Sequence, residues 1–141
     1  RAESPRLSGR PRVPPKWALA PWKGRDVHRS REEILADVEQ SRRHKLPASV
    51  LLIDSPWQTG YNDLTLNEEQ FREPDAMFAR VAALGFHVCF WITPFVNQQN
   101  VADMRGIHTW ASKTFQPAAA AGYLVKSQAT GRPQVVRWWK G

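Results

Sequence analysis

The chain has 141 residues, of which 42% are hydrophobic and 23% charged, so it has the size and composition of one ordinary globular domain. Its single cysteine, Cys89, excludes an internal disulfide framework, and no run of 18 apolar residues could span a membrane. The formal charge of +7 is concentrated at the ends, with seven basic and one acidic residue in 1–25, nine and twelve in 26–122, and four and none in 123–141.

Residues 1–15 are rich in arginine, proline and serine and end in Pro14-Pro15, which predicts a linker or an arm from a preceding domain. The sequence begins with arginine and lacks the apolar centre of a signal peptide, so we expect it to be a piece of a longer reading frame. The next segment, 17–22 (WALAPW), is apolar and fits a buried strand that Pro21 cuts short.

A helix is predicted to follow, because Ser30-Arg31-Glu32-Glu33 has the pattern of a capping box. Apolar side chains at Ile34, Leu35 and Val38 share one face at helical spacing, and Pro47 ends the segment. The continuous apolar run 50–53 (VLLI) then predicts a strand buried on both faces, as in a parallel sheet covered by helices.

The second half of the chain repeats this order. A long polar and aromatic loop, 55–67, leads to a helix that begins at Glu73-Pro74-Asp75 and ends at Gly85. Residues 86–93 (FHVCFWIT) predict a third buried strand. A polar loop follows at 98–107, then a helix at 110–121 that Pro117 interrupts, and a strand or hairpin beginning at 123–126.

The three predicted strands begin near Trp17, Val50 and Phe86, at intervals that each hold one helix. This spacing predicts parallel strands with right-handed crossovers. The Gly-rich and Walker sequences of nucleotide-binding folds are absent. The sequence therefore predicts an α/β fold, a partial TIM (β/α)8 barrel of about three βα units, with its chemistry at the loops that follow the strands.

Asp54 stands directly after four apolar strand residues, where it reads equally well as a ligand-facing acid or as a residue that closes the loop. Aromatic residues lie at or beyond the same strand ends, namely Trp57, Tyr61, Trp91 and Phe95. Their flat faces suit the apolar C–H face of a sugar ring, and ordinary core packing is the alternative. Together with Asp54 they predict a carbohydrate pocket.

Other chemistries find little support. The four histidines, His28, His44, His87 and His108, lack metal-ligand spacing and are interpreted as structural or surface groups. No Gly-x-Ser-x-Gly nucleophile elbow is present. The acids of the second loop and turn are expected to be solvated, namely Asp63, Glu68 and Glu69.

Three segments in register, 14–22 (PPKWALAPW), 50–57 (VLLIDSPW) and 85–98 (GFHVCFWITPFVNQ), resemble the start of the catalytic barrel of family 31 glycoside hydrolases, which include α-glucosidases and α-xylosidases. The resemblance extends over about residues 14–141. It implies that residues 16–141 form the N-terminal portion of such a barrel, which needs the remainder of the barrel in order to fold.

The resemblance also implies roles for four residues in substrate binding. Asp54 matches the family's acid that hydrogen-bonds sugar hydroxyls in the −1 subsite, and Trp91 matches the tryptophan that walls it. Trp57, or its neighbour Pro56, falls where the family often places an aromatic beside the sugar. The end of the first strand, from Trp22 to Asp26, would border the same pocket.

The family uses two aspartates on later strands as nucleophile and acid/base, so the resemblance implies no catalytic residue, metal or cofactor within this chain. The expected partner is an oligosaccharide or glycoside substrate, with no nucleic acid or membrane. A non-catalytic carbohydrate-binding remnant is the alternative. A nucleic-acid module using the terminal arginines Arg6, Arg10, Arg12, Arg132 and Arg137 is disfavoured, because the folded middle of the chain is acidic.

Overall fold

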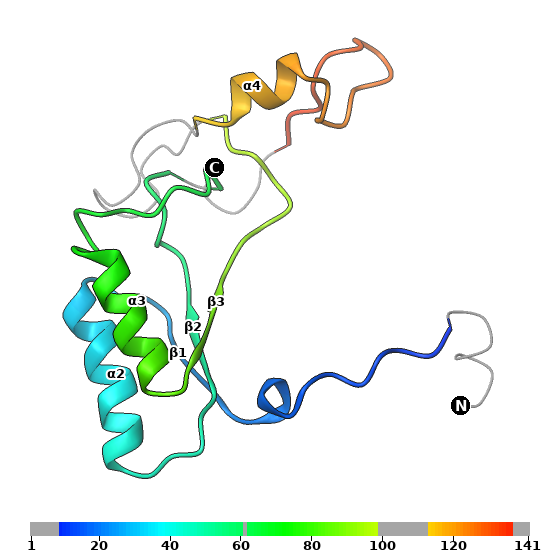
Figure 1. Cartoon of the computed structure of the whole chain (residues 1–141). Helices are drawn as coiled ribbons and strands as arrows, with labels where there is room; N and C mark the ends of the chain where they lie inside the picture. Colours follow the sequence, from blue (N-terminus) through cyan, green and yellow to red (C-terminus); the bar gives the residue numbers. More distant parts are fainter. Residues whose placement is uncertain (1–8, 61, 99–112, 137–141) are drawn as a thin grey trace.

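The computed structural model describes residues 9–60, 62–98 and 113–136 (Figure 1). Three strands form one parallel sheet in the order β1-β2-β3, which confirms the predicted α/β class and strand direction. The longer helices, α2 and α3, lie on the same side of this sheet (Figure 1). The elements in chain order are η1 (Lys16–Leu19), β1 (Trp22–Arg25), α2 (Arg31–Arg43), β2 (Val50–Ile53), α3 (Pro74–Ala83), β3 (His87–Phe90) and α4 (Phe115–Ala120).

The first strand was predicted too early. The apolar segment 17–22 supplies most of the 3-10 helix η1, whereas the strand begins at Trp22 and has the sequence WKGR. Two of its four residues, Lys23 and Arg25, are charged, so an apolar pattern could not reveal it. Their charges are acceptable there because both bind Asp37, which lies on the helix packed beside the strand.

Both long helices begin as predicted, α3 ends just before Gly85 as predicted, and α2 ends at Arg43, earlier than the predicted end at Pro47. At the start of α2 the Ser30 hydroxyl accepts a hydrogen bond from the Glu33 amide, and the Glu33 carboxylate accepts one from the Arg29 amide at 2.7 Å. Helix α3 has Pro74 at its first position, where the missing N–H costs nothing. Gly85, at a φ of 74° that glycine adopts without strain, follows the last turn of α3.

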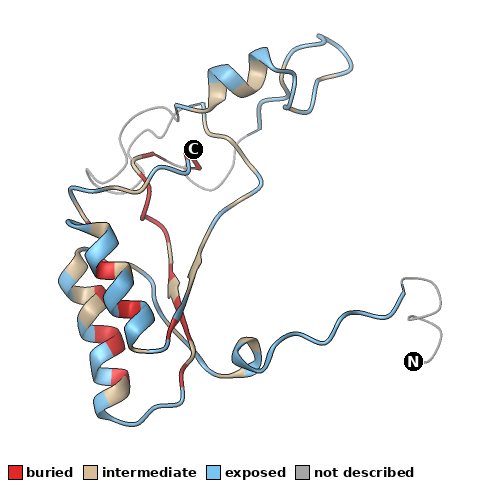
Figure 2. Ribbon diagram, viewed as in Figure 1, coloured by how far each residue is buried: buried red, intermediate tan, exposed pale blue. Residues whose placement is uncertain are grey.

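The hydrophobic core fills the space between the two helices and one face of the sheet. Leu51 and Ile53 of β2 are fully buried there, and Val88 and Phe90 of β3 pack against the same cluster. Figure 2 shows the buried positions along the sides of α2 and α3 that face the sheet and along β2. The helices and the segments that flank the strands complete the cluster with Ile34, Val38, Ala48, Trp57, Phe71, Met77, Val81 and Phe86.

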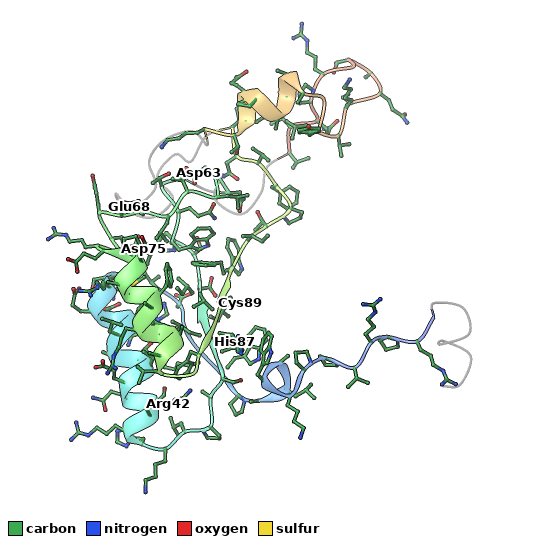
Figure 3. The ribbon with its side chains drawn as sticks, in the orientation of Figure 1. Arg42, Asp63, Glu68, Asp75, His87 and Cys89 are labelled. Carbon is green, nitrogen blue, oxygen red and sulfur yellow. The ribbon has the colours of Figure 1, made fainter. Side chains whose placement is uncertain are left out.

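Within the described residues, the other face of the sheet has no α-helix over it, and only the short 3-10 helix η1 lies against its starting edge, where Val50 is 1% exposed. Side chains alternate along a strand, so the partners of the core residues on this face are Leu52 in β2 and Cys89 in β3, and both are only half-buried. Figure 3 places Cys89 along β3 with His87, whose ring stacks on Trp17 of η1 at a centroid distance of 4.0 Å. We call this surface the open face of the sheet.

Arg42 joins three segments at the edge where the strands begin. Its guanidinium donates hydrogen bonds to the carbonyl oxygens of Leu84 at 2.7 Å and Ala48 at 2.9 Å. It also lies 3.9 Å from the ring centre of Phe86, a cation–π contact. Figure 3 shows Arg42 at the far end of α2 from Asp63 and Asp75, which lie toward the edge where β2 ends.

The C-terminal described residues, 113–136, form one short helix and a turn, and most of them are exposed (Figure 2). The predicted helix 110–121 begins outside the described residues. Within 113–121 helix α4 covers Phe115–Ala120, and Pro117 lies in its first turn, where proline is tolerated. Where a strand or hairpin was predicted to begin at 123–126, the described chain has one isolated antiparallel bridge, between Lys126 and Pro133. No helix in the parts of the chain that the structure describes is long and apolar enough to cross a membrane.

Candidate functional site

Asp54 and Trp91 lie next to each other at the edge where the strands end. Ile53 pairs with Phe90 in the parallel register, and the Trp91 amide donates a hydrogen bond to the Ile53 carbonyl at 2.9 Å, which extends the ladder by one step. By alternation both residues follow Leu52 and Cys89 on the open face. Two strand ends therefore bring a carboxylate and an indole together on that face.

The Asp54 carboxylate is half-buried. Its Oδ1 accepts a hydrogen bond from the Ser55 amide at 2.8 Å, so the loop-closing interpretation describes one of its two oxygens. Asp54 forms no ion pair with any residue that the structure describes. An ionised carboxylate offers about four acceptor positions, so Asp54 retains capacity to accept hydrogen bonds from a ligand's hydroxyl groups.

Trp57 belongs to the core. It is 7% exposed, and its ring packs on Phe90 with centroids 4.5 Å apart. Its Nε1 donates a hydrogen bond to the Trp91 carbonyl oxygen at 2.7 Å. Trp57 therefore fits the core-packing alternative better than a role as a free aromatic face. Its hydrogen bond to the Trp91 carbonyl places it next to the end of β3.

Trp22 lies at the opposite edge of the sheet. It pairs in register with Val50, four residues before Asp54, which corresponds to about 13 Å along the strand direction. Its side chain is 48% exposed, and Nε1 donates to the Ala18 carbonyl at 3.2 Å. The structure thus brings Asp54, Trp57 and Trp91 together and leaves Trp22 apart. Phe95 is half-buried beyond β3, and Tyr61 lies outside the described residues.

Asn62 connects the loop after β2 to the segment after β3, a contact that sequence reasoning missed. Its side-chain oxygen accepts from the Thr93 amide at 3.2 Å, and its Nδ2 donates to Thr93 Oγ1 at 2.6 Å. Its carbonyl accepts from Thr114 Oγ1 at 3.3 Å. Asn62 has a φ of 54°, which asparagine tolerates better than most residues.

Asp63 is 5% exposed, so the expectation that it would be solvated is wrong. Its carboxylate accepts hydrogen bonds from Thr59 Oγ1 and from the Thr65 amide, the latter at 3.0 Å, and so holds the loop in a turn. Glu68 and Glu69 are exposed, as expected. Each oxygen of the buried Asp63 carboxylate therefore accepts a hydrogen bond from within the loop.

A second cluster of charge lies on the helix-covered face, around Asp37 of α2. The Asp37 carboxylate accepts from Lys23 Nζ and Arg25 Nε, both at 2.9 Å, and lies 3.1 Å from His28 Nε2. Burial raises the pKa of Asp37, but the hydrogen bonds from Arg25 and Lys23 outweigh it and leave this pKa below its ordinary value. The cluster fastens β1 to α2.

His28 completes this cluster as a buried, structural histidine, as predicted. It is 1% exposed, and burial lowers its pKa more than the neighbouring Asp37 raises it, so the ring is neutral at pH 7. His44 and His87 are exposed, and His108 lies outside the described residues, as do Arg6 and Arg137. In residues 9–60, 62–98 and 113–136 no group of three or more His, Cys, Asp or Glu residues could hold a metal ion.

Comparison with known proteins points to one family. The model of the glycosyl hydrolases family 31 TIM-barrel domain matches residues 11–141. Similar curated proteins include the myogenesis-regulating glycosidase of Mus musculus, 30% identical over 90% of this chain, and the α-xylosidase XylQ of Lactiplantibacillus pentosus, 28% identical over 84%. The chain spans only 16% and 15% of the lengths of these two relatives.

Solved structures agree with this match. A GH31 dextranase from Flavobacterium johnsoniae complexed with glucose superposes with a TM-score of 0.79 at 25% identity, covering 95% of this chain and 15% of the dextranase. A mutant of the same enzyme complexed with isomaltotriose gives the same score. A GH31 α-xylosidase from a soil metagenome, complexed with xylose, shares the fold with a TM-score of 0.66 at 21% identity, covering 81% of this chain and 15% of that one.

Proposed function

We propose, since the chain belongs to the TIM-barrel domain of glycosyl hydrolase family 31, that it forms part of the sugar-binding wall of a retaining α-glycosidase. The substrate class is an α-xyloside or α-glucoside. The single observation that carries this proposal is the placement of Asp54 and Trp91 side by side at the carboxyl edge of two parallel strands, the edge where barrel enzymes hold their substrates.

The two residues supply complementary parts of a sugar site. The ionised carboxylate of Asp54 would accept hydrogen bonds from two hydroxyl groups of the terminal sugar, and such charge-assisted bonds are stronger than neutral ones. The indole of Trp91 would cover the apolar C–H face of the ring. Trp22 is left out of this proposal because it lies at the opposite edge of the sheet.

A retaining mechanism needs two carboxylates about 5 to 5.5 Å apart, one as nucleophile and one as acid/base. We assign neither role to this chain. Asp37 is bound by cations on the helix-covered face, and the Asp63 carboxylate is bonded within a turn, so neither is available for catalysis. Asp54 is proposed only as a binding group, because the family resemblance places both catalytic aspartates on later strands. The reaction itself needs no metal or organic cofactor.

We also propose that the rest of a barrel covers the open face and the two free strand edges. The strands β1 and β3 each have one neighbour, and the apolar side chains of Trp22 and Ile92 are 48% and 58% exposed. Unpaired strand edges and bare apolar faces favour aggregation unless another element covers them. The 141-residue chain alone is therefore expected to bind hydrophobic dyes and to unfold without cooperativity.

The test is an activity assay of the complete natural protein with 4-nitrophenyl α-xyloside, α-glucoside and the corresponding β-glycosides. We expect turnover of an α-glycoside with retention of anomeric configuration, followed by NMR of the first product. Hydrolysis only of β-glycosides, or inversion, would contradict the proposal. Binding of xylose or glucose without any turnover would instead favour the non-catalytic, carbohydrate-binding alternative.

A further inference from the structure

We infer that Trp57, Asn62 and Thr93 act as positioning residues that fix the backbone, and hence the indole, of Trp91. We call these three residues the strap, because they join the loop after β2 to the end of β3. The inference concerns the geometry of Trp91, and its consequence for sugar binding rests on the proposed function.

The first connection holds the carbonyl group of Trp91. Trp57 Nε1 donates to this oxygen at 2.7 Å, and the donor has little freedom because Trp57 is 7% exposed and packs on Phe90. Phe90 in turn meets Phe78 of α3 edge-on, with centroids 5.9 Å apart. The position of this donor is thus set by the core between the sheet and α3.

The second connection holds the chain two residues further on. The Asn62 side chain bonds both the amide and the hydroxyl of Thr93, at 3.2 and 2.6 Å, as a donor and an acceptor at once. Asn62 is 6% exposed, so water competes weakly for these bonds. An asparagine amide suits this task because it presents one acceptor and one donor side by side.

These contacts leave Trp91 little backbone freedom. Its amide is held by Ile53 in the sheet, its carbonyl by Trp57, and the chain beyond it by Asn62. The backbone fixes the Cα–Cβ direction of a residue and restricts its rotamers, so the strap sets the point from which the indole of Trp91 extends relative to Asp54. A displacement of about 1 Å at a substrate-positioning group can reduce turnover about 100-fold.

The test compares variants that remove one bond of the strap each; Thr93→Val keeps the shape of its side chain, whereas Trp57→Phe also makes the ring smaller. Trp57→Phe removes the Nε1 donor, and Thr93→Val removes the hydroxyl acceptor. Thr93→Ser retains the hydroxyl and serves as the conservative rescue. Ser41→Ala is the matched control, because Ser41 is 2% exposed and donates a 2.7 Å hydrogen bond to the Asp37 carbonyl in α2, outside the strap.

The first readout needs no activity. The complete natural protein is labelled with 5-fluorotryptophan, and the ¹⁹F resonance of Trp91 is assigned by its loss in Trp91→Phe. We expect Trp57→Phe and Thr93→Val to shift or split this resonance, and Thr93→Ser and Ser41→Ala to leave it in place. An unchanged Trp91 resonance in both strap variants would overturn the inference, whatever the protein does to glycosides.

The second readout measures the inhibition constant of D-xylose and kcat/KM for an aryl α-xyloside. We expect Trp57→Phe and Thr93→Val to weaken both by about tenfold or more, and Ser41→Ala at a similar loss of thermal stability to change them less than twofold. Equal losses in Ser41→Ala would show a general structural effect and overturn the inference. Failure of the unmodified protein to bind or cleave any glycoside would contradict the proposed function, and the fluorine resonance would still decide the strap.

Discussion

Asp37 and Asp54 are two carboxylates on opposite faces of the same sheet, and their surroundings differ in kind. Asp37 lies on the helix-covered face, where Lys23, Arg25 and His28 surround it. Asp54 stands at the end of β2 on the open face, where its one described hydrogen bond comes from the next amide in the chain. A carboxylate whose acceptor sites are filled by its own protein fastens elements together, and one whose sites are not filled is available to a ligand.

The same contrast extends to the apolar residues. On the helix-covered face, Leu51 and Ile53 are fully buried in one continuous cluster. On the open face, Leu52 is only half-buried, and Val50 is buried at the starting edge, where η1 lies. The helix-covered face thus contains most of the hydrophobic core, and the open face is the one proposed to contact the rest of a barrel and the sugar.

The largest effect is expected from breaking the covered face. Leu51→Ala should cost about 3 kcal/mol or more of the local opening free energy that protects the α2 and α3 amides of the 141-residue chain, because it leaves a cavity in a closed core. Leu52→Ala on the open face should cost about 1 kcal/mol, since less burial is lost. Hydrogen exchange of the α2 and α3 amides measures both changes. Equal costs would contradict the distinction between the two faces.

The two aspartates give the next largest difference. Asp37→Asn should lower the free energy of unfolding by about 3 kcal/mol, the low end for breaking a buried ion pair, because Lys23 and Arg25 remain partly in water. Asp54→Asn should leave thermal stability nearly unchanged and weaken sugar binding about 10- to 100-fold, the loss of charge-assisted hydrogen bonds. Thermal unfolding and xylose inhibition of the complete protein measure the two effects. A loss of sugar binding in Asp37→Asn, together with a loss of stability in Asp54→Asn, would contradict these assignments.

Arg42 tests the edge of the sheet opposite Asp54. Arg42→Lys keeps the charge but loses the forked donors that reach Leu84 and Ala48, so we expect a loss of about 2 kcal/mol. Sugar affinity should not change, because Arg42 lies at the edge where the strands begin (Figure 3). Urea midpoints together with inhibition constants measure this. A change in sugar affinity would show that the two edges are coupled.

The smallest expected effect is a pH dependence from His28. Burial holds its pKa below the ordinary value, with Asp37 opposing the shift and Arg25 and Lys23 adding to it. As pH falls below about 6.5 the unfolded chain takes up a proton that the folded chain refuses, so stability decreases, by at most about 1.4 kcal/mol per pH unit. His28→Gln should remove this slope between pH 7 and 5. Thermal midpoints at several pH values measure it, and an unchanged slope would assign it to another group.

Elements whose signals are local could be predicted from the sequence. The run VLLI, the capping box at Ser30 and the Pro74 start each depend on neighbouring residues, and the structure confirms all three elements. Strand β1 was misplaced because Lys23 and Arg25 look like surface residues until their partner on α2 is known. An apolar pattern indicates which positions are buried. It does not reveal that a charged strand residue forms a hydrogen bond with a residue 12 or 14 positions away.

At the site, the position of Asp54 could be predicted because it directly follows the apolar run 50–53. Trp91 was placed within a strand predicted over 86–93, and because the strand ends at Phe90, Trp91 lies just beyond it. The role of Trp57 and the contact between Asn62 and Thr93 could not be predicted, because they join residues that are 31 to 34 positions apart in the sequence. The buried Asp63 was missed for a related reason, since its partners Thr59 and Thr65 are polar residues in a loop that reads as solvated.

The most direct measurement is a crystal structure of the complete natural protein with D-xylose or D-glucose bound. We expect a sugar hydroxyl within about 2.6 to 3.2 Å of an Asp54 carboxylate oxygen, and the indole of Trp91 against the ring. A sugar bound away from the carboxyl ends of β2 and β3, with Asp54 and Trp91 both out of contact, would contradict the account.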